Sequence, residues 1–244
     1  MLSTVVDGIQ ITLAVVVGCL LASILVVLWR RGRYRYSHMF GVYLGTQLLI
    51  NLTYLGTRLF GLLGLRTSPD VFDSWGFWAT KESIYAAIRM VLLAEITMLV
   101  FRALPRARAR AQLVLLIATV VLAAALLWPY KAHTLAEFAV DITGRFAYVT
   151  IWSLIAILML VAWHQVPLHP LHKTILYGML CLMVAHFASG YTLSHWGDVR
   201  AGFAHNVVQL LVLGMWFRRV RVAEPVLLPE EIAVVRYLQP WRAQ

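Results

Sequence analysis

Two charges of opposite sign interrupt one of the most apolar stretches of the chain. Residues 88–101 read IRMVLLAEITMLVF and contain Arg89 and Glu95. Ionisable side chains inside a membrane-spanning segment cost about 2.5–3.5 kcal/mol on insertion scales and usually face the interior of a helix bundle. Such residues can form hydrogen bonds or ion pairs between helices, bind a polar ligand, or relay protons.

The spacing of the two charges decides whether they can neutralise each other. On a helix, the step from Arg89 to Glu95 turns through about 120° around the axis, so the two side chains do not form a self-contained pair. We therefore expect each to need a partner on another helix. Glu82 precedes Arg89 by two helical turns on the same face, and the long arginine side chain can lean towards it.

Other polar side chains lie at similar depths in the apolar stretches. Depth is counted from the centre of each stretch at about 1.5 Å per residue. The residues at overlapping depths, biased to the outer half, are Asn51, Arg89, Arg145, His186, Asn206 and Gln209. With Glu95 they form the candidate site, which depth alone leaves open to three interpretations. They are hydrogen bonds that hold helices together, an outward-open cavity for a small anionic or hydrogen-bonding molecule, and a proton relay through Glu95 and His186.

Motifs for catalysis and cofactor binding are missing from the sequence. It contains no phosphate-binding loop, zinc-protease motif or pair of catalytic carboxylates. A retinal Schiff base would need a lysine near the middle of a span, and the lysines lie at the ends of the apolar stretches. His164, His169 and His172 are interrupted by prolines and have no nearby carboxylate or thiol, so we expect no metal site. The sequence thus predicts neither an enzyme nor a bound cofactor.

The elements that must position these residues are long and apolar. Hydrophobic residues make up 61% of the 244, charged residues 13%, and the mean hydropathy is +0.77. Each stretch has about the ~20 residues that a helix needs to cross ~30 Å of hydrocarbon, where each segment must satisfy its own backbone polar groups. We predict an all-α membrane protein, a seven-transmembrane helix bundle. The spans are about 8–29, 38–60, 82–102, 110–128, 143–163, 173–195 and 202–218.

Arginines indicate the orientation of this bundle. They gather after the first, third and seventh stretches, which share one side of the membrane, and acidic residues prevail on the other side. Under the positive-inside rule, the N-terminus lies outside and the C-terminus in the cytoplasm, in a bacterial inner membrane. The net charge of +10 is then a topology signal, and the expected partner is the lipid bilayer with no nucleic acid. The arginines are Arg30, Arg31, Arg33, Arg35, Arg102, Arg106, Arg108, Arg110, Arg218, Arg219 and Arg221.

The chain divides into a bundle, residues 1–221, and a cytoplasmic interfacial tail, residues 222–244. The tail has a helix-start signal and an apolar edge, so we expect a short amphipathic helix on the membrane surface. Trp29, Trp163 and Trp216 lie near span ends, where we expect a belt of aromatic residues at the interface.

A GxxxG pattern in the second stretch offers a packing surface. Gly41 and Gly45 lie on one helix face and favour close helix approach. The approach is either within the bundle or between protomers of a homo-oligomer.

Several stretches resemble a family of bacterial seven-span membrane proteins of similar length that has no assigned activity. The resemblance rests on LLAEITMLVFRALPRAR at the end of the third span, Arg145 at the start of the fifth and NVVQLLVLGMW in the seventh. Glu95, Arg145, Asn206 and Trp216 are the positions that match. The resemblance implies the seven-span architecture and carries no mechanism.

The sequence therefore favours a non-catalytic multi-pass membrane protein. The first hypothesis is a receptor-like sensor or small-ligand-binding module with an outward-biased polar cavity. The alternative is a structural subunit or self-assembling protomer of a larger membrane complex, which the short connectors and the GxxxG pattern suggest. Small-solute transport is weaker, because the sequence shows neither internal repeats nor broken helices.

Overall fold

The described part of the chain is helical throughout. The structure is a computed structural model that describes residues 2–62, 75–102, 104–127, 135–166, 168–196 and 198–222. Within these ranges it has seven α-helices, one short 3₁₀ helix and no strand, so the predicted all-α class is confirmed. Beyond Val222, the predicted tail lies outside the described residues. The elements are α1 Leu2–Arg30, η1 Arg33–Tyr36, α2 His38–Leu62, α3 Trp75–Val100, α4 Pro105–Leu127, α5 Leu135–Trp163, α6 Pro170–Trp196 and α7 Asp198–Arg221.

Each apolar stretch of the sequence falls on one of these helices. The boundaries follow proline, which cannot supply the backbone N–H that a helix interior needs. Pro105 and Pro170 occupy the first residues of α4 and α6, the position where proline is tolerated. No described helix carries a proline beyond its first residue.

Four helices in the described ranges are long and apolar enough to cross a membrane. These segments are Gly8–Arg30, Thr80–Val100, Gly144–Trp163 and Pro170–Ala188. Large apolar side chains also face outwards on α4, among them Leu113, Leu116 and Val120. An outward apolar face of this kind suits hydrocarbon better than water. The helical structure is thus compatible with a membrane protein.

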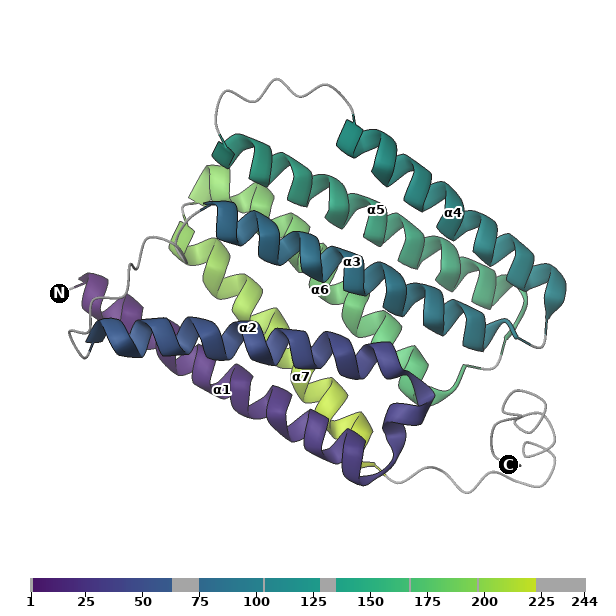
Figure 1. Cartoon of the computed structure of the whole chain (residues 1–244), viewed down its shortest axis with the longest axis horizontal. Helices are drawn as coiled ribbons and strands as arrows, with labels where there is room; N and C mark the ends of the chain where they lie inside the picture. The colour runs from purple at the N-terminus through teal and green to yellow at the C-terminus, as the bar shows by residue number, and fades with distance from the viewer. Residues whose placement is uncertain are drawn as a thin grey trace.

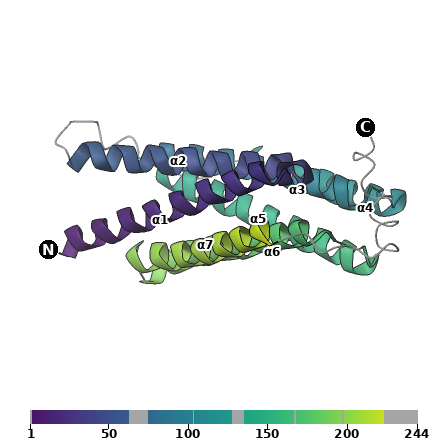
Figure 2. The ribbon, with the colours of Figure 1, turned by 90° about the horizontal axis from the view of Figure 1, so that it is seen from below.

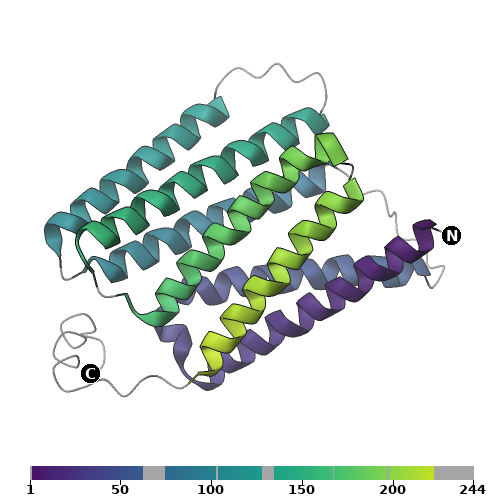
Figure 3. The ribbon, with the colours of Figure 1, turned by 180° about the vertical axis from the view of Figure 1, so that it is seen from behind.

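Six of the helices form a closed ring. Around it, α1 packs on α2, α2 on α3, α3 on α5, α5 on α6, α6 on α7, and α7 back on α1. The remaining helix, α4, lies at the outer edge against α5 and α3 (Figure 1). Seen edge-on, α2 and α3 lie on one side, α6 and α7 on the other, and α1 and α5 run obliquely between them (Figure 2). From behind, α6 and α7 lie side by side and connect α5 to α1 (Figure 3).

Aromatic side chains fill the ring at the end where α2 begins and α7 ends. Trp216 of α7 is fully buried and meets Phe40 and Tyr43 of α2 edge to face, with ring centroids 5.1 and 6.2 Å apart. Trp216 therefore packs inside the bundle, in place of the exposed position that an aromatic belt residue would have. Trp29 and Trp163 are instead 75% and 80% exposed, as the predicted belt requires.

Arginines fasten the connector after α1 to the end of α7. Arg33 donates to the carbonyl of Arg219 at 2.8 Å and also to that of Val222, and Arg31 donates to Arg221 at 2.6 Å. The last carbonyls of a helix have no partner inside the helix and carry partial negative charge, so guanidinium groups stabilise this end.

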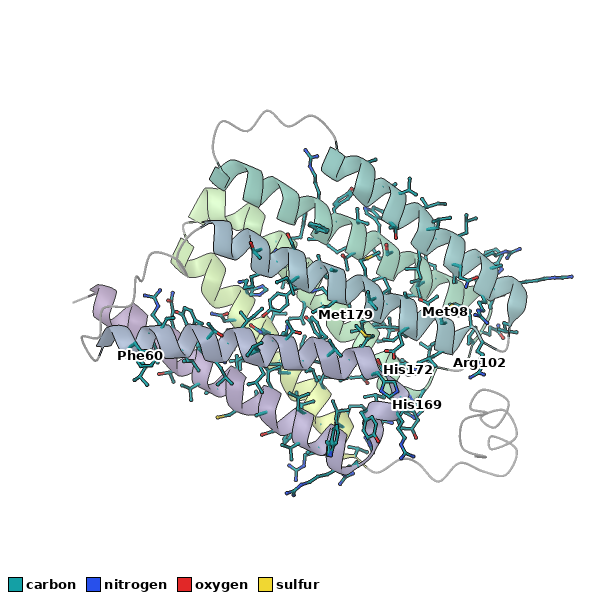
Figure 4. All side chains as sticks on the ribbon, viewed as in Figure 1. Phe60, Met98, Arg102, His169, His172 and Met179 are labelled. Atoms are coloured by element: carbon teal, nitrogen blue, oxygen red, sulfur yellow. The ribbon has the colours of Figure 1, made fainter. Side chains whose placement is uncertain are left out.

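Two histidines at the start of α6, His169 just before it and His172 within it, meet the same end of the bundle. His172 donates from Nε2 to the carbonyl oxygen of Tyr36 in η1 at 2.8 Å, and His169 stacks on the Tyr36 ring at 4.5 Å (Figure 4). These histidines thus tie α6 to η1. Within the described residues, no group of three or more His, Cys, Asp or Glu side chains is placed to hold a metal ion.

Candidate functional site

Three charged residues gather near the start of α3. Glu82 and Arg89 are only 7% and 8% exposed, and Arg89 Nη2 lies 3.7 Å from Glu82 Oε2. Lys81 Nζ lies 3.4 Å from the other carboxylate oxygen, Oε1. The arginine therefore leans towards Glu82 as the spacing suggested, and its charged partner is on its own helix.

The Arg89 guanidinium also meets two aromatic rings. Its Cζ atom lies 5.4 Å from the ring centroid of Tyr85 on α3 and 6.0 Å from that of Tyr43 on α2. A cation within about 6 Å of an aromatic face is attracted by the negative charge of the ring surface. The contact with Tyr43 supplies the interaction with another helix that the sequence led us to expect, in the form of a ring rather than a carboxylate.

A pocket of about 410 Å³ opens beside this charged group, inside the helix ring. Five helices contribute to it, with α4 and α5 taking no part among the described lining residues. The lining positions lie towards the N-terminal halves of α3 and α7 and the C-terminal half of α6. The pocket therefore occupies the half of the bundle away from the buried Trp216. Its polar and aromatic lining residues are Gln10, Tyr43, Gln47, Asn51, Tyr54, Lys81, Glu82, Tyr85, Arg89, His186, His205, Asn206 and Gln209.

Most of the candidate residues from the sequence converge on this pocket. The sequence predicted that these residues lie at similar depths along their helices. The helices that carry them all belong to the ring and surround the pocket. The five that line the pocket are Asn51, Arg89, His186, Asn206 and Gln209.

Several buried polar atoms of the lining have no hydrogen-bond partner among the described residues. They are Gln47 Oε1, Glu82 Oε2, Arg89 Nε and His205 Nδ1. Buried polar groups in proteins are nearly always hydrogen-bonded to protein or water, because leaving one unsatisfied costs about 1–3 kcal/mol. The side chains that carry these atoms line the pocket and bring both donor and acceptor groups to it.

The wall between α1 and α2 depends on Asn51. Its Nδ2 donates to the carbonyl of Ala14 at 2.8 Å, and the same atom lies only 2.8 Å from where a Cβ would sit on Gly18. The missing side chain at Gly18 therefore leaves room for the amide. Asn51 lines the pocket and fixes the two helices that form this wall.

Tyr43 lies between the pocket and the aromatic cluster. It lines the pocket, accepts a hydrogen bond from Gln47 Nε2 at 2.8 Å and contacts the Trp216 ring. The Trp216 indole donates to the carbonyl of Thr174 at 3.1 Å. It fits only because Gly178 has no side chain, since a Cβ there would lie 2.5–2.9 Å from the indole. The floor of the pocket is thus a close contact of α2, α6 and α7.

Glu95 has a different role from Arg89 and does not line the pocket. Its carboxylate accepts hydrogen bonds from Ser37 Oγ at 2.6 Å, His38 N at 2.9 Å and Met39 N at 3.1 Å. Ser37 Oγ in turn accepts from Phe40 N at 3.2 Å. The first backbone N–H groups of a helix have no partner inside it. Glu95 and Ser37 together satisfy three of these groups at the start of α2.

The remaining candidate residues also lie outside the pocket lining. Arg145 is half-buried on α5 and is not among the lining residues. At Gly41 and Gly45 an added Cβ would meet nothing within 4 Å. Among the described residues, neither glycine therefore makes the close approach to a neighbouring helix that the pattern favours.

Sequence reasoning missed several lining residues that have a detectable signal. In α2, Tyr43, Gln47 and Asn51 recur every four residues and so share one helix face. His205 precedes Gln209 by the same interval on α7, and its ring lies 5.7 Å from that of His186. Extending each candidate by one helical turn would have found Gln47 and His205.

The comparisons with known proteins add no relative. No protein-family model, curated protein or solved structure matches the chain. The fold and the pocket are therefore the basis of the function proposed below.

Proposed function

We propose that this protein is a seven-span membrane protein that binds a small polar molecule in the pocket and acts as a receptor-like sensor or ligand-binding module. The observation that carries the proposal is a pocket lined by polar side chains from five helices; four of these side chains also carry a buried atom without a hydrogen-bond partner among the described residues. A pocket of about 410 Å³ is within the size range of small-molecule sites in proteins. A polar pocket of this size inside an apolar bundle costs stability, which ligand binding would offset.

The proposed topology places the N-terminus outside and the C-terminus in the cytoplasm of a bacterial inner membrane. The contacts of Arg31 and Arg33 with the last residues of α7 support it, because they bring two of the arginine-rich segments to one end of the bundle. The positive-inside rule assigns that end to the cytoplasm. The pocket occupies the opposite half and would then face the outer side.

Native mass spectrometry of the protein purified in mild detergent tests this function. We expect a monomer that carries a bound small molecule, and we expect Arg89→Ala and His186→Ala to remove it. Gln209→Leu is a milder variant that keeps the charges and the volume while removing one polar group from the lining. Arg106→Ala removes an exposed arginine from the other end of the bundle and is the control. If the wild-type protein carries no bound molecule and the variants differ from it only in stability, ligand binding is contradicted. These residues would then serve to hold the helices together.

The alternative is a structural subunit or self-assembling protomer. The open faces of Gly41 and Gly45 favour it, because two copies of such a face can approach closely. A discrete oligomer that Gly41→Leu dissociates would support this alternative.

A further inference from the structure

The charges that line the pocket do not balance. Lys81 and Arg89 are cations and Glu82 is the one carboxylate among the lining residues described, so one positive charge is in excess. Lys81 and Arg89 share this one carboxylate, with Arg89 buried and the Lys81 side chain 24% exposed, so the two cations together retain a net attraction for an anion. A monoanion in the pocket would neutralise this excess, whereas a cation would double it.

Arg89 is presented in a form that suits an anion. The two tyrosine rings hold the guanidinium, and its distance of 3.7 Å from Glu82 exceeds that of a normal hydrogen bond. Its Nε atom has no hydrogen-bond partner in the described part of the chain. A guanidinium offers its donors in a planar fork that matches the two oxygens of a carboxylate.

The other lining residues indicate which uncharged groups the ligand should have. Gln47 and Glu82 line the pocket and carry acceptor oxygens, so a hydrogen-bond donor on the ligand would be complemented there. Apolar residues of α1, α2 and α6 complete the wall. The volume is far larger than the ~30 Å³ of one water molecule, so an inorganic ion would leave most of the pocket to solvent. The apolar lining residues are Leu13, Ala14, Val17, Leu21, Ile50, Leu182 and Met183.

We infer that the pocket recognises a small organic monoanion of the carboxylate type, with its charged group on Arg89 and Lys81, a hydrogen-bond donor towards Gln47 and Glu82, and an apolar body against α1 and α6. This inference rests on the proposed function, because it names the chemical class of ligand for the same pocket.

Three probes of equal size and different charge test the inference. They are 4-hydroxyphenylacetate, its neutral amide, and the cation tyramine, each titrated calorimetrically into the full-length protein in detergent at fixed ionic strength. We expect the anion to bind at least about tenfold more tightly than the other two. Arg89→Gln should abolish this preference, and Glu82→Gln should tighten binding of the anion by about fivefold or more, because it removes a like charge. Arg106→Gln removes a cation from the far end of the bundle and should change nothing.

The outcomes separate this inference from the proposed function. Equal binding of the amide, or tighter binding of tyramine, would overturn the anion class and leave ligand binding intact. If no probe binds but native mass spectrometry finds a bound molecule, its charge decides: a monoanion upholds the inference, and a neutral or cationic molecule overturns it. A protein that binds no probe and carries no molecule would remove both the inference and the proposed function.

Discussion

Removal of the Glu95 carboxylate is expected to destabilise the fold without affecting the pocket. Glu95→Ala deletes the acceptor of three hydrogen bonds at the start of α2, two of them from backbone N–H groups. Hydrogen bonds to a charged group contribute about 1.5–3 kcal/mol each, and loss of a helix cap costs about 0.5–2 kcal/mol. Glu95 is half-buried, so water replaces part of what is lost. We therefore expect the free energy of unfolding to fall by about 2–3 kcal/mol.

The assay is equilibrium unfolding in mixed detergent micelles, together with hydrogen exchange of the His38 and Met39 amides. Exchange at these amides should accelerate in Glu95→Ala, and Glu95→Gln should show about half of the loss in stability, because it keeps one acceptor oxygen. Ser37→Ala should cost about 1 kcal/mol and show coupling to Glu95→Ala in a double-mutant cycle. Unchanged stability of Glu95→Ala combined with loss of a bound molecule would refute the assignment of Glu95 as a cap and return it to the ligand site.

Two further substitutions test close contacts of the bundle. Gly178→Ala should lower the free energy of unfolding by about 1–3 kcal/mol, because the new Cβ would overlap the Trp216 indole. Gly214→Ala adds a methyl group where nothing lies within 4 Å and should be neutral or slightly stabilising. Equal effects in the same unfolding assay would contradict the close contact. Arg33→Ala should cost about 2 kcal/mol and accelerate hydrogen exchange in the last turn of α7, because two carbonyls lose their guanidinium partner. Exchange unchanged from that of Arg106→Ala would contradict this role.

The helices were predictable because their signal is local. An apolar stretch of about 20 residues that ends near proline or arginine specifies a helix whatever lies beside it. All seven predicted stretches have about this length, and each coincides with a helix of the structure. Membrane crossing is supported by length and composition for four of them within the described residues.

The pocket was predictable only in part, because depth along a helix is one coordinate of three. Depth grouped Asn51, His186 and Gln209 with Arg89, and all four line the pocket, but it also included Arg145, which is not among the described lining residues. Whether a residue at a given depth faces the pocket depends on its angle around the helix axis. That angle becomes meaningful only when the order of helices in the ring is known.

The helical class, the approximate helix boundaries and the presence of costly charges in apolar segments can be read from the amino-acid sequence alone. Each of these follows from residue type and spacing along one chain. Helix packing was needed to show that Arg89 lines a pocket while Glu95, on the same helix, caps the start of α2. It also decided that Trp216 fills the ring instead of lying at the interface. The physical reason is that a polar group in an apolar bundle is stabilised by whichever partner reaches it, and these partners come from helices far apart in the sequence.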